Sequence, residues 1–230
     1  MGDTGTRLRT IARRAFFTVC CFCASAAAQS SATQVAIPAP NIASLIPAGG
    51  VAGSQLNVSF NGNGDSAIVF SYTAPSENSP YLDGIVKVMK YSAKGWTSAF
   101  EESYQIGPGQ DEIQLDRVKA ADGKEAVVVV FQHSGAGTTT DWHIIAMKGV
   151  GFVVLDPKHM RDKALRSRGY PFMGYNGVKV SGDVVSEELP GYSQGRARCC
   201  PDLPSISMNV RFTGSAIKLD SVTEIPGTPR

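Results

Sequence analysis

The sequence predicts an all-β fold of mainly antiparallel meanders, in a blade-like or sandwich arrangement, with one short helix near residues 157–168. From Leu56 onward, short apolar or alternating runs rich in Val, Ile, Phe and Tyr are each bounded by Gly, Asn, Asp, Ser or Pro. That pattern is typical of strands separated by turns. One stretch alone satisfies the boundary rules for a helix. We therefore expect a single β-rich domain at residues 56–225.

The first 28 residues have the pattern of an export signal. Four arginines at positions 7, 9, 13 and 14 precede a short apolar run, and the small residues 24–28 follow as a cleavage site. We expect residues 1–28 to be removed, so that the mature protein begins near Gln29 in the periplasm or outside the cell. The adjacent Arg13 and Arg14 leave both general secretion and twin-arginine export open.

Removal of the signal changes the charge balance. Residues 1–28 carry a net charge of +3, whereas the whole chain carries +2, so the mature chain is close to neutral at about −1. Nothing in it resembles the concentrated positive field that nucleic-acid binding needs. The apolar run of the signal is also far shorter than the roughly 20 residues that span a bilayer. The sequence therefore predicts no nucleic-acid partner and no transmembrane segment in the mature chain.

Residues 29–55 are expected to form a flexible lead-in, because they contain several Pro and Gly residues and no charged side chain. The β-rich domain then shows two similar series of turns and strands. The first series has a turn at 61–65, strands at 67–73 and 84–92, and a turn at 94–95; the second has a turn at 122–125, strands at 126–133, 142–148 and 152–155, and a turn at Gly149. This repetition predicts meanders from a duplicated element. Segments 177–185 and 206–219 are expected to add strands without repeating the order clearly.

The predicted helix has Asp156 as its N-cap, Pro157 at its first position and Gly169 just beyond its end. It is strongly basic, and only Met160, Ala164 and Leu165 are expected to pack inward. One interpretation is binding to an anionic surface. The other, which we favour, is a solvated helix face.

Two cysteines, Cys199 and Cys200, stay in the mature chain and are adjacent. Their Cα atoms lie about 3.8 Å apart, which is short of the usual disulfide range. Three interpretations are open: a strained vicinal disulfide that stiffens a loop, two buried thiols, or a bridge to another molecule. An oxidising compartment favours the first. No pair of Cys or His lies at metal-ligand spacing, so neither a metal nor a cofactor is predicted.

Two turns with their following strands resemble units of FG-GAP or VCBS-type proteins. The matching segments are Phe60-Asn61-Gly62-Asn63-Gly64-Asp65 and Ala121-Asp122-Gly123-Lys124-Glu125-Ala126-Val127-Val128. The resemblance implies propeller blades, and a calcium ion in each turn. Calcium prefers six to eight oxygen ligands, and these turns offer too few carboxylates, so we interpret both as structural turns. The Cys199-Cys200-Pro201 segment also resembles secreted lipoproteins of the LppP/LprE type.

Candidate functional residues are few. Trp96 and Trp142 could stack on sugar rings, which would make the protein a carbohydrate-binding module. His133, Asp141 and His143 are the residues on which a hydrolase site could be built. No nucleophile elbow surrounds Ser134, and successive residues of a strand point to opposite faces. The sequence therefore predicts no catalytic residue.

The hypothesis that needs the fewest coincidences is an exported, non-enzymatic interaction or structural module of the cell envelope. In this hypothesis the β-rich domain presents the loops at 75–83 and 134–141 to another envelope protein or polymer. The carbohydrate-binding module and the hydrolase are the alternatives.

Overall fold

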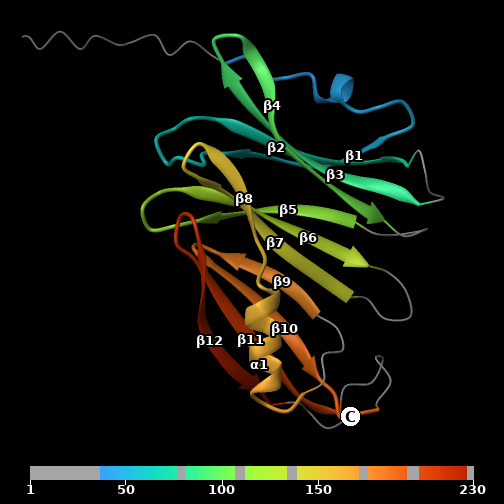
Figure 1. Ribbon diagram of the computed structural model, residues 1–230, viewed down its shortest axis with the longest axis vertical. Helices are drawn as coiled ribbons and strands as arrows, with labels where there is room; N and C mark the ends of the chain where they lie inside the picture. Colours follow the sequence, from blue (N-terminus) through green and yellow to red (C-terminus); the bar gives the residue numbers. More distant parts are fainter. Residues whose placement is uncertain are drawn as a thin grey trace, which may run out of the picture. The chain divides into compact units, whose positions relative to one another are not determined.

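The computed structural model describes residues 37–76, 81–106, 112–133, 139–170, 176–195 and 202–226. Within these residues, strands form three four-stranded antiparallel sheets, and each sheet is built from consecutive strands (Figure 1). There is one α-helix, α1 (Lys158–Arg166), in the described part of the chain. The prediction of an all-β fold with one short helix near 157–168 is confirmed.

Each of the three sheets is a meander of four strands. The first sheet contains β1 (Val51–Val58), β2 (Ala67–Pro75), β3 (Leu82–Ser92) and β4 (Gly95–Ile106). The second contains β5 (Glu112–Lys119), β6 (Glu125–His133), β7 (Thr139–Lys148) and β8 (Gly151–Leu155). The third contains β9 (Asn176–Ser181), β10 (Val184–Gly191), β11 (Leu203–Phe212) and β12 (Ile217–Ile225). The region that seemed not to repeat the order clearly thus forms a third meander of the same kind.

The second sheet is central, because both of its faces are buried. On β6, Val127 and Val129 pack with Val69 and Val88 of the first sheet. The intervening Val128 packs with side chains of the third sheet, such as Ile206. Since alternate residues of a strand face opposite sides, a strand buried on both faces must be apolar throughout. This explains the unbroken apolar run 126–131.

The segment before β1 packs onto the outer face of the first sheet. Residues 42–45 form a short 3-10 helix, η1 (Ile42–Leu45), and Ile42, Leu45 and Ile46 contact a cluster on that face that includes Phe70 and Tyr72. The indole Nε1 of Trp96 donates to the carbonyl oxygen of Pro38 at 2.6 Å. Residues from Ile37 onward therefore belong to the same compact unit as the sheets. Strand β1 begins at Val51, five residues before the start of the β-rich domain that the sequence suggested at residue 56.

Helix α1 connects β8 to β9 and begins one residue later than predicted, because Pro157 rather than Asp156 is its N-cap. The carboxylate of Asp156 accepts the backbone N–H of Lys158 at 2.7 Å, and Gly169 has a φ of 69° just beyond the end. Lys158, His159, Lys163 and Arg166 are exposed, as a basic solvated face requires. Arg161 departs from the expectation, because it is buried to 1 % exposure together with Ala164 and Leu165.

The two turns that resemble FG-GAP units lie against each other. A Cβ atom on Gly62 would come within 2.9 Å of the backbone carbon of Gly123, so a side chain at position 62 has no room. The backbone N–H of Ser59 donates to the Glu125 carboxylate at 2.9 Å, and Glu125 N–H donates to Ser59 O at 3.1 Å. The equivalent turn of the third sheet follows, since Lys119 N–H donates to Gly182 O at 2.9 Å. The first turns of the three sheets thus adjoin in sequence order.

Among the described residues, no helix has the length and apolar character that crossing a membrane requires. The predicted export signal at residues 1–28 and Cys199 and Cys200 lie outside the described residues.

Candidate functional site

A pocket of about 280 Å³ opens where β4 ends, β5 begins, β6 ends and β7 begins. This is the right-hand end of the upper two sheets in Figure 1. The described residues that line it come from four strands: Tyr104, Gln105, Ile106, Glu112, Ile113, Phe131, Asp141 and His143.

The alternation of strand side chains decides which residues enter the pocket. Tyr104 and Ile106 on β4 face the second sheet, as does Glu102, which lies two residues before Tyr104. On β7, Asp141 and His143 point to this side, whereas Trp142 between them points to the third sheet. In the ladder between β6 and β7, Phe131 pairs with Asp141 and Val129 pairs with His143. The polar side chains of Asp141 and His143 therefore lie at the edge of the otherwise apolar interface between the first and second sheets.

Three polar side chains form a connected group at the inner wall of the pocket. The hydroxyl of Tyr104 lies 2.9 Å from Nε2 of His143, and Oε2 of Glu102 lies 3.3 Å from the same nitrogen. Burial alone would raise the pKa of the Glu102 carboxyl, but the hydrogen bonds from His143 and Tyr104 outweigh it and lower the pKa. Burial and the adjacent Glu102 carboxylate raise the pKa of the Tyr104 phenol far above its usual value. Glu102 is therefore an anion and Tyr104 a neutral hydroxyl at neutral pH.

The same wall carries three rings in mutual contact. The ring centroid of Tyr104 lies 4.3 Å from that of Phe131 and 5.7 Å from that of His143. Phe131 and His143 are 5.4 Å apart. In all three pairs the rings are tilted relative to each other, which is a favourable arrangement for aromatic side chains. The three rings together form an aromatic part of the pocket wall.

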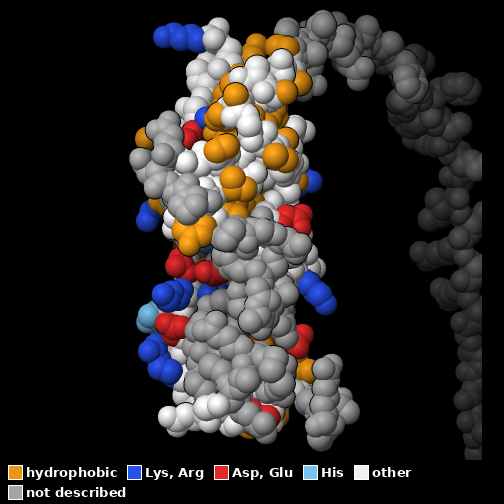
Figure 2. Space-filling view, turned by 90° about the vertical axis from the view of Figure 1, so that its right-hand side faces the viewer, with side chains coloured by type: hydrophobic (Ala, Val, Ile, Leu, Met, Phe, Trp, Pro, Cys, Tyr) orange, Lys and Arg blue, Asp and Glu red, His pale blue; other side chains and the backbone are white. Residues whose placement is uncertain are grey.

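A second, more open pocket of about 490 Å³ adjoins the first at the start of β1. Both are lined by Glu112 and Ile113, and the hydroxyls of Ser54 and Ser71 donate to Ile113 O at 3.4 Å each. Exposed Val51, Tyr81 and Leu82 lie at this end of the first sheet. Figure 2 faces this end and shows hydrophobic side chains gathered over the first sheet, with acidic side chains at their lower margin.

The structure brings together two of the residues singled out from the sequence, Asp141 and His143, in the pocket. In the ladder between β6 and β7, His133 pairs with Thr139, four residues away from His143. The side chain of His133 lies outside the described residues. Glu102, Tyr104 and Phe131 were missed by the sequence reasoning. The period-two spacing of Glu102, Tyr104 and Ile106 was the signal that could have indicated them.

The two tryptophans differ in the exposure that sugar stacking needs. Trp142 is 1 % exposed, and its Nε1 donates to Oε2 of Glu187 at 3.0 Å inside the interface between the second and third sheets. Trp96 is half-buried and is held by the carbonyl of Pro38. Trp142 therefore cannot take the sugar-stacking role considered from the sequence.

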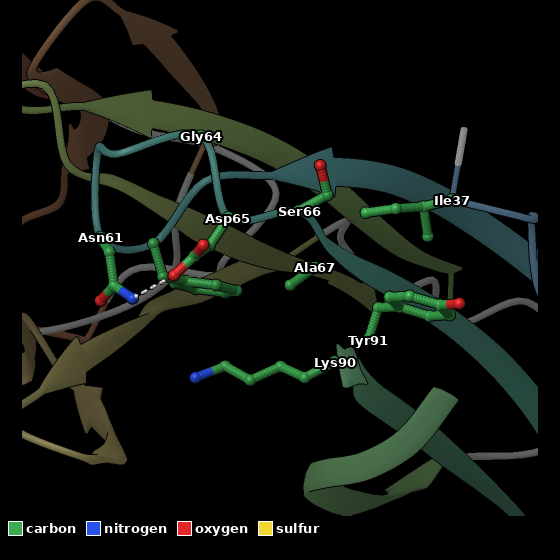
Figure 3. A pocket seen from close by; sticks show the side chains of 9 residues that line it. Ile37, Asn61, Gly64, Asp65, Ser66, Ala67, Lys90 and Tyr91 are labelled. Carbon is green, nitrogen blue, oxygen red and sulfur yellow. Dashed lines mark hydrogen bonds between the residues drawn. The ribbon is translucent and has the colours of Figure 1, made fainter. Parts of the chain in front are cut away.

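The turn at 61–65 lines another pocket, of about 250 Å³, shown in Figure 3. The side chains of Asn61 and Asp65 point toward each other there, and Nδ2 of Asn61 donates to Oδ2 of Asp65 at 3.1 Å. The backbone N–H of Asp65 donates to Oδ1 of Asn63 at 3.2 Å. These bonds hold the turn by its own side chains, which is consistent with a structural role. In the described ranges, no group of three or more His, Cys, Asp or Glu side chains could hold a metal ion.

In comparisons with known proteins, the chain matches no family model and no curated protein.

Proposed function

We propose that the protein is a non-enzymatic binding module of the cell envelope, exported through the signal at residues 1–28. Its binding end is the one where β2–β3, β4–β5 and β6–β7 are connected. The observation that carries the proposal is the pair of adjoining pockets at this end, which share Glu112 and Ile113.

The surroundings of the pockets support this proposal. Val51, Tyr81 and Leu82 are 66 %, 39 % and 40 % exposed. Isolated exposed apolar side chains are ordinary, but a group of them beside two pockets is typical of an interaction site. The loops at 75–83 and 134–141, which the sequence suggested as partner-binding segments, both connect strands at this end.

The hydrolase alternative has less support. Asp141 and His143 line one pocket, which such a site would need, but no Ser, Thr or Cys is found among the described residues that line it. A nucleophilic mechanism requires such a group within hydrogen-bond reach of its base. A binding role requires only the aromatic and acidic walls that the pocket has.

Photo-crosslinking inside the cell tests the proposal. A benzophenone amino acid is placed at Leu82, at the proposed binding end, or at Val150, in the β7–β8 turn at the other end of the sheets. Val150 is fully exposed, so it is the more accessible control. We expect a discrete crosslinked product from position 82 and none from position 150. Equal products at both positions, or none at position 82, would contradict the proposed binding end.

A further inference from the structure

The carboxylates are the charged side chains among the described residues that line the pocket. Among its described lining residues, Glu112 and Asp141 are acidic and none is Lys or Arg. Glu102 adds a third carboxylate behind Tyr104 and His143. An anionic ligand would be repelled from this end of the first two sheets.

The carboxylates differ in how far they are already neutralised. Asp141 is 3.2 Å from Nη1 of Arg161, so part of its charge is compensated. Glu102 is 3.3 Å from Nε2 of His143. Glu112 is exposed at the pocket mouth, and no Lys or Arg in the described part of the chain pairs with it. Glu112 is therefore the carboxylate most available to a ligand.

The inner wall of the pocket carries aromatic rings beside its polar groups. The faces and edges of Tyr104, Phe131 and His143 occupy it, within 4.3 to 5.7 Å of one another. A hard metal ion prefers a shell of several oxygen ligands, which aromatic rings do not supply. An organic cation suits such a wall, because its alkyl part packs on the rings and its charge is attracted by ring faces and by the carboxylates.

We propose that this pocket binds an organic cation that bears an alkylammonium or guanidinium group, with Glu112 as its principal counter-charge. The inference rests on the proposed binding function and names the ligand class of the same site. Two sources share this chemistry: a free amine, and the side chain of Lys or Arg on a partner protein. Tyr104 positions the site, because its hydroxyl lies 2.9 Å from Nε2 of His143 and its ring forms part of the wall.

Binding is measured by NMR on the mature chain, through the ring signals of His143. The free-amine probe is cadaverine, and its control is 1,5-pentanediol, which has the same length and no charge. The protein-side-chain probe is the capped peptide Gly-Lys-Gly, and its control has norleucine in place of Lys. We expect saturable shifts with at least one cationic probe and none with its neutral control. Which probe binds more tightly identifies the source.

Two matched variants make the assignment specific. Glu112→Gln removes the exposed carboxylate without changing the side-chain size, and we expect it to weaken cation binding about tenfold, as loss of one charge-assisted contact does. Glu188→Gln makes the same change on an exposed residue of β10, away from the pocket, and should leave binding unchanged. Both variants are expected to keep the native fluorescence of buried Trp142.

Three results would overturn the inference: equal shifts with charged and neutral probes, no shift with either cation, or unchanged binding in Glu112→Gln. The crosslinking experiment separates this failure from that of the proposed function. A product at position 82 in a protein that binds no cation would leave the binding end supported and the ligand class wrong. A chain that binds cadaverine but gives no product at position 82 would support the ligand class and contradict the partner-binding surface.

Discussion

Two polar groups lie on opposite faces of the central sheet, and they differ in their access to solvent. On one face, Tyr104 and His143 line a pocket, and Glu102 lies behind them, 3.3 Å from Nε2 of His143. On the other, Arg161, Glu187 and Trp142 are all 1 % exposed between the second and third sheets. Consecutive residues of β7 supply both groups, because alternate side chains of a strand point to opposite faces.

The closed group is a buried ion pair with an added donor. Nε of Arg161 and Nε1 of Trp142 each donate to Oε2 of Glu187 at 3.0 Å. Burial raises the pKa of Glu187, and the charge of Arg161 together with the two hydrogen bonds opposes that rise. A buried pair gains little net stability, but loss of one partner leaves a charge without compensation. The closed group is therefore expected to be required for stability, whereas the open group is accessible to a ligand.

The largest expected effect is loss of the Arg161 guanidinium. Arg161→Leu leaves the Glu187 carboxylate buried without its counter-charge, and we expect a loss of about 3–5 kcal/mol in the free energy of unfolding. Urea denaturation measures it. The double variant Arg161→Leu, Glu187→Leu should recover most of this loss, since it removes both charges. A double variant as unstable as the single one would show that the guanidinium acts through other contacts.

Loss of the indole donor is expected to cost less. Trp142→Phe keeps most of the apolar volume and removes the hydrogen bond to Glu187, so the expected loss is about 1–3 kcal/mol. Thermal denaturation followed by circular dichroism measures it. In Trp96→Phe, the matched change at a half-buried site, a smaller loss is expected. Equal losses of stability in Trp142→Phe and Trp96→Phe would show that the closed group is no more important for stability than a half-buried site.

The open group should tolerate the corresponding change. Tyr104→Phe keeps the ring in the aromatic wall and removes the hydroxyl that lies between His143 and Glu102. Because water can reach this pocket, we expect a loss of roughly 1 kcal/mol or less in the free energy of unfolding. Denaturant titration beside Trp142→Phe measures the difference. A loss as large as that of Trp142→Phe would show that the open group is also structural.

The carboxyls of Glu102 and Glu187 should also affect the pH dependence of stability with opposite signs. The pKa of Glu102 is lowered from its usual 4.5, so its contribution to stability is present above 4.5 and is lost as the pH falls through the folded-state value. The pKa of Glu187 is raised from 4.5, so stability falls as the pH rises from 4.5 through the folded-state value. Glu102→Gln should therefore flatten the acidic limb of the stability curve, and Glu187→Gln the limb above 4.5. Unfolding measured across this pH range distinguishes them by sign.

Much of the fold could be predicted from the sequence because it depends on local patterns. The apolar run 126–131 and the turn residues 122–125 determine β6 and its start wherever they lie in space. The helix boundaries at Asp156 and Gly169 are likewise local. The third sheet was hard to recognise as a repeat, because its strands carry polar residues on one face. Ser186, Asn209 and Ser221 form a hydrogen-bonded ladder across β10, β11 and β12 on that face.

The candidate site was predicted only in part, because it depends on contacts between distant strands. Asp141 and His143 attracted attention as titratable residues close in sequence. Their partners Glu102 and Tyr104 lie about 40 residues earlier, on a strand of another sheet, and no local pattern connects them. Arg161 was expected to be solvated for the same reason, since its buried partner Glu187 belongs to the third sheet. Helix periodicity alone does not reveal a buried ion pair.

Each sheet consists of consecutive strands, and this order affects how the chain folds as it is synthesised. Hairpin contacts within a sheet are short in sequence separation and form quickly. A chain that emerges N-terminus first can pair β1 to β4 before β5 is available. The apolar side chains of the first sheet, such as Val69 and Val88, then stay exposed to solvent until Val127 and Val129 of the second sheet pack against them. The interval between completion of the first sheet and arrival of the second is therefore when the emerging chain is most exposed to aggregation and most in need of a chaperone.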